Sequence, residues 1–392
     1  MTRHALNASF TLFLAIALQA LADTPKAGPE FDESKLAAVP RAIERTIADH
    51  EISGAVTLIA TRDRFVQLSA VGMADVENKT PMRPDAIFWI ASMTKPVTAT
   101  SILMLEQEGK LSIDDPVAKY IPELGSLKLS DGRPANITLK HLLTHTSGML
   151  LEAPRDVTSR AHTLADLIPA YARAPLRFEP GTKWEYCQAG INSLGRVIEV
   201  VSGKSLPEFF QERIFVPLGM KDTTFYPSPE QARRLAVTYR KAGDKLEAAP
   251  SPVTPHDHYP AANGGLYSTA SDYGRFCQML LSDGTFEGHQ ILRPETVRRM
   301  RSIQTGDLHT GFTEGDGWGL GVCVVREPQG VTAMLSPGTF GHGGAFGTQA
   351  WIDPVKGVIY VLMVQRRDFG NSDNSPVRKA FQEAAAEALT SP

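Results

Sequence analysis

The amino-acid sequence predicts an α+β fold, an α/β sandwich in which helices flank one antiparallel sheet and a mostly helical domain is inserted. Three observations predict it. Runs rich in β-branched residues occur near both ends of the chain, at 54–71 and 318–364. The region between them carries helical patterns instead. Because both ends contribute strands, the simplest arrangement is one sheet assembled from both ends and covered by helices.

The N-terminal part is expected to begin with a helix over 35–50 and to continue into a hairpin. Residues 54–60 and 64–71 are two β-rich runs, and the polar segment 61–63 between them is typical of a turn. A second helix is expected to open near Ser92. Its apolar residues recur at helical spacing until a glycine ends the pattern, and they are Val97, Ile102, Leu103 and Leu105, followed by Gly109.

The middle of the chain is predicted to be helical, and the C-terminal part returns to strands. Helices are expected at 139–143, 164–172, 190–201, 206–214, 268–281 and 294–300. Strands are expected at 318–325, 348–352 and 357–364, before a last helix over 377–389. These elements divide the mature chain into 23–110 and 301–392, the two parts of the α/β domain, and 111–300, the inserted helical domain.

Residues 1–22 have the pattern of a secretory signal peptide. Arg3 is a positive charge near the start, the run 10–21 is mostly apolar, and small residues precede an expected cut after Ala22. The run is shorter than the about 20 apolar residues of a membrane-spanning helix. We therefore expect a secreted or periplasmic protein without stable membrane insertion, with an uncleaved anchor as the alternative.

Length and charge exclude some function classes. With 392 residues and 42% hydrophobic content, the chain is long enough to bury a large core. Its net charge of −3, without a basic block, gives no support to nucleic-acid binding. Cys187, Cys277 and Cys323 are dispersed and follow neither a zinc pattern nor a disulfide framework, although one pair could still bridge.

His141 and His145 are the one pair with metal-ligand spacing. Two histidines four residues apart can bind zinc, but Leu142 stands where the HExxH motif has glutamate, and no third ligand is marked. We therefore expect no metal and no cofactor. The two histidines are interpreted as braces of their helix and of the turn 146–148.

The most informative stretch holds Ser92 and Lys95. Residues three apart share a helix face, so the Lys95 amine lies beneath the Ser92 hydroxyl. A lysine surrounded by apolar residues such as Trp89 and Met93 has its charged form disfavoured, which lowers its pKa and lets it accept the serine proton. The unpaired N–H groups of the first helical turn favour negative charge there. A serine N-cap and a solvated lysine are the structural alternative.

Two other segments are candidates for the same site. Tyr186, in a loop before a helix, could relay a proton as acid or base, or could simply pack. The glycine-rich segment 340–347 lets the backbone approach a substrate, or could be a hairpin turn. There the Ala345 N–H, together with the Ser92 N–H, could form an oxyanion hole, and His342 could act as a donor or a general acid.

These elements carry a family resemblance. The ordered segments Ser92-Met93-Thr94-Lys95, Tyr186-Cys187-Gln188 and His342-Gly343-Gly344 resemble the S-x-x-K, Y-x-N and K/H-x-G motifs of the class C β-lactamase and penicillin-binding-protein (DD-peptidase) superfamily. Further stretches are similar to common superfamily segments, at 141–148, 178–181, 217–220 and 318–321. The likeness covers about residues 35 to 390. It implies a β-lactamase/transpeptidase-like fold and a serine acyl-enzyme.

The resemblance also implies substrate-binding residues, and two of them depart from the family pattern. The implied residues are Gln188, Trp318, His342, Gly343 and Gly344, and the segment 263–265 is implied to lie near the site. Gln188 stands where the lactamases usually carry Asn, and His342 where they usually carry Lys. A histidine that is largely neutral at pH 7 suits a substrate carboxylate less than a permanent cation does. Family VIII carboxylesterases are similar and tolerate both changes.

The sequence therefore predicts a secreted serine hydrolase that acts through an acyl-enzyme on Ser92, with Lys95 and Tyr186 as proton carriers. A carboxylesterase for short-chain acyl esters is the first hypothesis. A β-lactamase or D-alanyl-D-alanine carboxypeptidase is the alternative, and a catalytically inactive relative that binds peptidoglycan or a peptide is an alternative of another class. The expected partner is a small-molecule ester, β-lactam or D-alanyl peptide. No G-x-S-x-G elbow is present, which disfavours an ordinary α/β-hydrolase.

Overall fold

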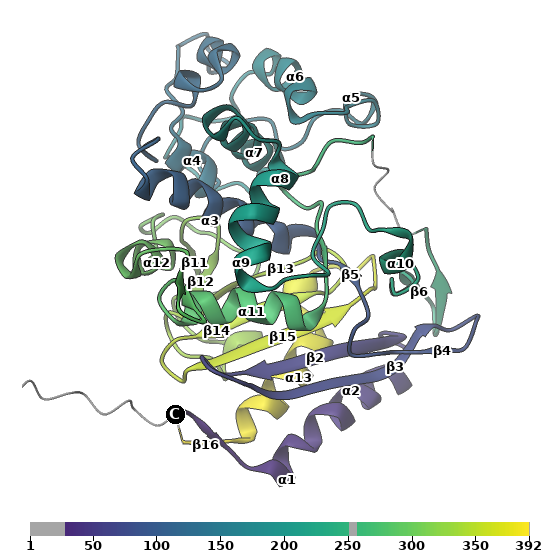
Figure 1. The fold of residues 1–392 in the computed structure, drawn as a ribbon. Coiled ribbons are helices and arrows are strands. Elements are labelled where there is room, and N and C mark those ends of the chain that lie inside the picture. Colours follow the sequence, from purple (N-terminus) through teal and green to yellow (C-terminus); the bar gives the residue numbers. More distant parts are fainter. Residues whose placement is uncertain (1–27, 251–256, 392) are drawn as a thin grey trace, which may run out of the picture.

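The computed structural model describes residues 28–250 and 257–391, and it confirms the predicted fold class. Its centre is an eight-stranded, fully antiparallel sheet that joins strands from both ends of the chain (Figure 1). The order across the sheet is β11 (Asp316–Trp318), β12 (Cys323–Val325), β13 (Phe340–Gly343), β14 (Gln349–Asp353), β15 (Val358–Val364), β2 (Gly54–Ala60), β3 (Phe65–Asp75) and β4 (Thr80–Pro81).

The two ends of the chain meet at the pair β2 and β15. The strands run antiparallel, with Leu58 opposite Val361 and Ile59 opposite Tyr360. Every residue of both strands is buried, because helices cover both faces of the sheet here. This explains why the two runs read as continuously apolar and β-branched rather than as alternating. The predicted hairpin of β2 and β3 is confirmed.

The outer face of the sheet is covered by the terminal helices. These are α1 (Glu33–Leu36), α2 (Ala38–Ala48) and α13 (Pro376–Glu387). The expected helix over 35–50 is therefore two short helices in succession, and the expected C-terminal helix is confirmed. Strand β1 (Glu30–Phe31) pairs with β16 (Leu389–Ser391) and joins the two ends again beside this layer (Figure 1).

The inner face of the sheet is covered by α11 (Ala270–Leu281), and the mostly helical part lies beyond it (Figure 1). Helix α3 (Thr94–Gln107) links the two, and its residues from Thr94 to Leu105 are all buried. The remaining helices are α4 (Leu139–Leu143), α5 (Arg155–Thr158), α6 (Ile168–Arg173), α7 (Gln188–Ser202), α8 (Leu206–Phe210), α9 (Val216–Leu218), α10 (Pro229–Ala232) and α12 (Pro294–Met300).

One apolar core runs from the inner face of the sheet through α3 into the helical part. Short two-stranded pairs complete the fold: β5 (Phe88–Trp89) with β8 (Tyr267–Ser268), β6 (Tyr239–Ala242) with β7 (Lys245–Ala248), and β9 (Thr285–Phe286) with β10 (His289–Gln290). The domain boundaries at 110 and 300 stay a prediction. The expected signal peptide lies outside the described residues.

The sequence interpretation was wrong in two places. The single strand expected at 318–325 is a hairpin of β11 and β12, because Gly321 has φ +73° and turns the chain between them. The segment 340–347 was read as a connection between strands, but Phe340–Gly343 is itself the strand β13, paired with β12 and β14. Only its last four residues turn.

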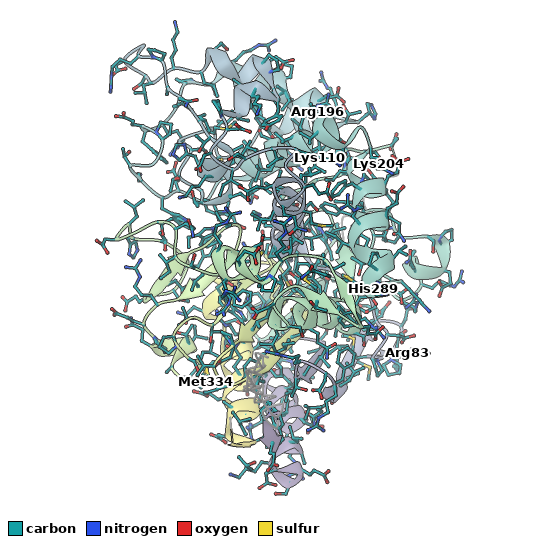
Figure 2. The ribbon with its side chains drawn as sticks, turned by 60° about the vertical axis from the view of Figure 1, so that its left-hand side comes forward. Arg83, Lys110, Arg196, Lys204, His289 and Met334 are labelled. Carbon is teal, nitrogen blue, oxygen red and sulfur yellow. The ribbon has the colours of Figure 1, made fainter. Side chains whose placement is uncertain are left out.

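Charged side chains are spread over the surface of several elements. Arg196 and Lys204 lie at the helical end of the molecule, whereas Arg83 lies toward the sheet (Figure 2). Many are paired, as Arg196 is with Glu199. Among the described residues, the helices are too short or too polar for any to cross a bilayer.

The contact between α11 and the sheet provides a test of the fold. A Cβ built on Gly274 in α11 lies 2.3 Å from Leu58 Cδ2 on β2. We expect Leu58→Ala to lower the free energy of unfolding by about 2–5 kcal/mol, and Gly274→Ala to lower it by about 1–3 kcal/mol through overpacking. Urea denaturation measures both.

In the double variant, the methyl group at 274 enters the space that Leu58→Ala opens. We therefore expect Gly274→Ala to be neutral or stabilising in the Leu58→Ala background, where alanine also forms helix better than glycine. Simple addition of the two losses would contradict this packing.

Candidate active site

Ser92 lies where a strained turn meets the buried helix α3. It is the middle residue of a single 3₁₀ turn, Ala91–Met93, which leads directly into α3. Ala91 has φ +44°, which is uncommon for a residue other than glycine. The Ile90 N–H bonds to the Leu266 carbonyl, next to the pair of β5 and β8. These contacts hold the turn, so the Ser92 hydroxyl is presented from a rigid support.

The Lys95 amine lies beneath this hydroxyl, as the spacing predicts. Its Nζ is 3.1 Å from Ser92 Oγ and donates to the Asn263 carbonyl at 2.6 Å. The side chain is 0% exposed. This burial lowers the pKa of Lys95 well below its usual value of 10.5. The amine is thus biased toward the neutral form, in which its nitrogen can accept a proton.

Tyr186 borders the same amine with its ring. Lys95 Nζ lies 4.7 Å from the centre of the Tyr186 ring, and Tyr186 Oη is 3.4 Å from His342 Nε2. Burial raises the pKa of the phenol well above 10, although a hydrogen bond with Ser92 opposes this rise. The phenolate form of Tyr186 is therefore disfavoured. A protonated phenol beside a neutral amine is the state this environment favours.

His342 is held neutral on β13. Burial and the nearby Lys95 amine lower its pKa to about 3, so the expectation that it is neutral at pH 7 is confirmed. Its Nδ1 lies 2.6 Å from the Gly343 carbonyl oxygen, which can only accept, so Nδ1 carries the proton. Nε2 is then free to accept a hydrogen bond from the Tyr186 hydroxyl. A neutral histidine in this tautomer cannot supply a cation.

His145 is a member of the site that the sequence interpretation missed. Its ring centre is 4.5 Å from that of Tyr186 and 5.1 Å from that of Trp318. Nδ1 accepts the Cys187 N–H at 3.1 Å, which anchors the chain immediately after Tyr186. Burial lowers its pKa well below 6.5. Its φ of +57° is a further strained position, but no sequence pattern marks it.

Trp318, which the resemblance implied as a substrate-binding residue, lines neither of the two hollows at Ser92 and packs behind Tyr186 and His342. It is 0% exposed, and its ring centre lies 5.6 Å from that of His342 and 6.1 Å from that of Tyr186. Trp184 lies at 5.2 Å from Trp318 on the other side. The rings of Trp184, Trp318 and His145 pack together and hold the Tyr186 and His342 rings in position.

Two glycines let β13 approach its neighbours closely. A Cβ on Gly344 would lie 2.5 Å from the Ile90 carbonyl oxygen, and one on Gly343 would lie 1.9 Å from Asp373 Oδ1. The Gly344 N–H bonds to the Thr348 carbonyl at 2.7 Å. Only glycine therefore allows the strand to run beside both the Ser92 turn and the segment around Asp373.

Two hollows meet at Ser92, and both contain Gln188 and Ala345. We name the first the β13 hollow. It is lined by Ser92, Tyr186, Gln188, Phe312, His342, Gly343, Gly344, Ala345, Phe369, Gly370, Asn371, Ser372 and Asp373. We name the second the Trp89 hollow. It is lined by Trp89, Ala91, Ser92, Glu152, Ser159, Gln188, His258, Tyr259, Ala261, Asn263, Gly264, Gly265 and Ala345.

The structure thus brings Ser92, Lys95, Tyr186, Gln188 and the segment of β13 and its turn together. Asn263 and its neighbours also lie at the site, as the resemblance implied. Sequence reasoning missed the Asn263 carbonyl as the anchor of Lys95, and it missed the 369–373 wall. The wall contains no recognisable motif, and a carbonyl group has no side-chain signature.

Among the described residues, no cluster of three or more metal-binding side chains occurs. His141 Nδ1 accepts the Thr138 N–H at 3.2 Å in a capping box, which confirms its interpretation as a helix brace. The three cysteines are free and buried, so none of them pairs.

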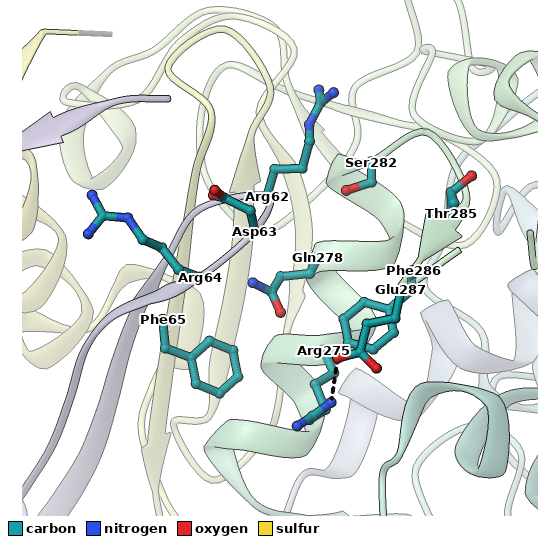
Figure 3. A pocket seen from close by; sticks show the side chains of 10 residues that line it. All are labelled: Arg62, Asp63, Arg64, Phe65, Arg275, Gln278, Ser282, Thr285, Phe286 and Glu287. Atoms are coloured by element: carbon teal, nitrogen blue, oxygen red, sulfur yellow. Dashed lines mark hydrogen bonds and ion pairs between the residues drawn. The ribbon is translucent and has the colours of Figure 1, made fainter. Parts of the chain in front are cut away.

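A third hollow lies between α11 and the turn of β2 and β3 (Figure 3). Gln278 points from α11 toward this turn and donates to the Thr61 carbonyl, and Arg275 pairs with Glu287 at 3.5 Å (Figure 3). Ser282 is among its lining residues, but no histidine, lysine or tyrosine lines it to activate that hydroxyl. The nucleophile and its base are found at Ser92.

Known proteins similar to this chain agree with the geometry. A family model described as Beta-lactamase matches residues 39–384. Protein Rv1367c of Mycobacterium tuberculosis strain ATCC 25618 / H37Rv is 36% identical over 346 residues, 80% of this chain and 86% of that protein. Esterase EstB of Burkholderia gladioli is 30% identical over 389 residues, 90% of this chain and 96% of EstB.

A solved structure extends the similarity to three dimensions. EstCE1, described as a hydrolase with promiscuous acyltransferase activity, superposes with a TM-score of 0.78 at 26% identity, over 89% of this chain and 99% of EstCE1. The resemblance inferred from the three ordered motifs is therefore confirmed. The chain belongs to the β-lactamase and penicillin-binding-protein superfamily of serine hydrolases.

Proposed function

We propose that this protein is a carboxylesterase that cleaves short-chain acyl esters through an acyl-enzyme on Ser92. The observation that carries the proposal is the buried Lys95 amine, 3.1 Å from Ser92 Oγ, with a lowered pKa. A neutral amine in hydrogen-bond contact with a hydroxyl is a competent general base. The names of EstB and EstCE1, an esterase and a hydrolase with acyltransferase activity, favour an ester.

In the acylation step, Ser92 Oγ attacks the ester carbonyl carbon and its proton passes to Lys95 Nζ. The carbonyl oxygen gains negative charge, which the N–H groups of Ser92 and Ala345 are proposed to bind. Ala345 suits this role because it lines both hollows beside Ser92. The ester C–O bond then breaks, and the leaving alkoxide takes a proton from the Tyr186 hydroxyl.

In the deacylation step, a water molecule attacks the acyl carbon. The Tyr186 phenolate left by the acylation step takes its proton, and the Lys95 ammonium returns a proton to Ser92 Oγ as the acyl group leaves. Asn263 and His342 assist by orientation: the Asn263 carbonyl holds the amine, and His342 Nε2 faces the Tyr186 hydroxyl. Water enters through the open hollows on both sides of Ser92.

An ester is favoured over a β-lactam or a D-alanyl peptide by the charge of the site. Those two substrates carry a carboxylate, which a cation recognises best. Here the family's usual lysine is replaced by His342, whose pKa is lowered to about 3. A neutral imidazole gives a carboxylate little attraction. We also propose export of the protein, on the sequence pattern of residues 1–22 alone.

The acyl-enzyme provides the first test. We expect rapid hydrolysis of p-nitrophenyl butyrate, slow or no turnover of nitrocefin, and a mass increase of one butyryl group on Ser92 in quenched samples. Ser92→Ala removes the nucleophile and should lower kcat/KM by roughly 10³-fold or more.

Ser282→Ala is the matched control, since this serine lines the hollow beside α11 and should keep activity. If a fluorophosphonate gives no adduct and no ester is hydrolysed, the protein is a binding relative and not a hydrolase. Faster turnover of nitrocefin than of esters would instead favour a β-lactamase.

The pKa of Lys95 provides the second test. Because its folded-state pKa is lowered by burial, the amine is neutral at pH values where an ordinary lysine is charged. We expect kcat/KM for p-nitrophenyl butyrate to reach its plateau well below pH 10, and to fall as the pH drops through the lowered pKa. Spontaneous hydrolysis is subtracted at each pH.

Lys95→Met should lower kcat/KM by about 10²- to 10⁴-fold, the usual size of general base catalysis. It should also remove the acidic limb of the profile. A wild-type profile that continues to rise tenfold per pH unit between pH 9 and 10 would show a lysine of ordinary pKa and would contradict the proposed base.

A further inference from the structure

We propose that Asp373 selects the alcohol part of the ester by charge, favouring neutral or cationic leaving groups over those that carry a carboxylate. The inference rests on the proposed esterase function and names the substrate class for that site. Asp373 belongs to none of the three motifs. It reaches the β13 hollow from the segment that precedes α13.

The alcohol part of the substrate belongs in the β13 hollow. The leaving oxygen must take up a proton, so its donor must lie within hydrogen-bond reach. Tyr186 and His342 both line the β13 hollow, and neither lines the Trp89 hollow. The acyl part therefore extends into the Trp89 hollow, between Trp89 and Tyr259.

Asp373 determines the charge of this hollow. It is the one acidic residue among the lining residues, and no lysine or arginine lines the hollow. His342 is the one basic side chain among these lining residues, and the neutral form is favoured because its pKa is lowered to about 3. A leaving group in the β13 hollow therefore meets one potential negative charge and no positive one.

The carboxyl group lies directly against the reacting strand. Oδ1 would be 1.9 Å from a Cβ on Gly343, so the group packs onto the backbone between His342 and Gly344. Among the described residues, Oδ1 is buried without a hydrogen-bond partner. The carboxyl group also has a hydrogen bond with Gln349, so it is held in place, and its charge acts on a substrate in the hollow through space.

Arg378 holds this segment through the main chain of Asp373. The guanidinium is 0% exposed and lies over the Trp351 ring, 4.0 Å from its centre. Its NH1 donates to the main-chain carbonyl of Asp373 at 2.6 Å, and its Nε to Gln382 at 3.0 Å.

Arg378 also interacts electrostatically with Asp316, so its one positive charge is shared between two carboxyl groups. Burial raises the pKa of Asp373, and Arg378 opposes that rise. The assays are run at pH 8, because a high pH favours the ionised form of a carboxyl group whose pKa is raised.

Three substrates with the same butyryl group separate the charge of the leaving group from the chemistry. They are p-nitrophenyl butyrate, the butyrate ester of 5-hydroxy-2-nitrobenzoic acid, which adds a carboxylate, and the butyrate ester of 3-hydroxy-N,N,N-trimethylanilinium, which carries a cation. Each kcat/KM is divided by that for p-nitrophenyl butyrate. We expect Asp373→Asn to raise this ratio about tenfold for the anionic ester and to lower it about tenfold for the cationic one.

Asp368→Asn is the matched control. It removes one negative charge from the same stretch of chain, but Asp368 is exposed, pairs with Arg367 at 3.2 Å and lines neither hollow. Its φ of +62° also suits asparagine. Both ratios should match those of the wild type in this variant. Equal shifts in the two variants would indicate a general charge effect and overturn the proposal.

The unmodified protein provides a second measurement in case Asp373→Asn does not fold. Raising the ionic strength should weaken the preference for the cationic over the anionic ester, because both interactions are electrostatic. Unchanged ratios in a folded Asp373→Asn variant, or a wild-type preference for the anionic ester, would overturn the role of Asp373. Failure of the wild type to cleave p-nitrophenyl butyrate would instead overturn the proposed function.

Discussion

The site depends on excluding water from the Lys95 amine, which lies beside the Ser92 hydroxyl. Lys95 sits in α3, whose residues are buried from Thr94 to Leu105 because the sheet layer and the helical part both pack around this helix. A charged amine would lose its hydration there, so the neutral base is favoured. The Asn263 carbonyl is an acceptor that stabilises either form, and it replaces the water that burial removes. The apolar core around α3 thus lowers the pKa of Lys95.

The same exclusion of water sets the states of the neighbouring groups. Burial keeps the Tyr186 hydroxyl protonated and His342 neutral, and His145 beside them is also biased to its neutral form. The site therefore moves protons without holding a permanent cation. The acidic residues that line the two hollows are Asp373 in the β13 hollow and Glu152 in the Trp89 hollow. In the proposed function, reactivity and substrate choice thus come from different parts of the chain.

Much of the fold could be predicted from the sequence, and the exceptions have physical reasons. The hairpin of β2 and β3, the helix α12 and the union of both chain ends in one sheet follow from local apolar patterns. The hairpin of β11 and β12 was missed because its two strands are short and only four residues, 319–322, separate them. Strand β13 was missed because its glycines lower strand propensity, and its partner strands compensate for that loss.

The sequence by itself determined the reactive pair. Ser92 and Lys95 are three residues apart on one helical face, and such local geometry follows from the helical repeat. Tertiary structure decided which groups surround the pair. The Asn263 carbonyl, the His145 ring and the Asp373 carboxylate reach it from distant segments, and no local pattern encodes those distances. It also decided the protonation states, because desolvation depends on everything packed around a group and not on its neighbours in the chain.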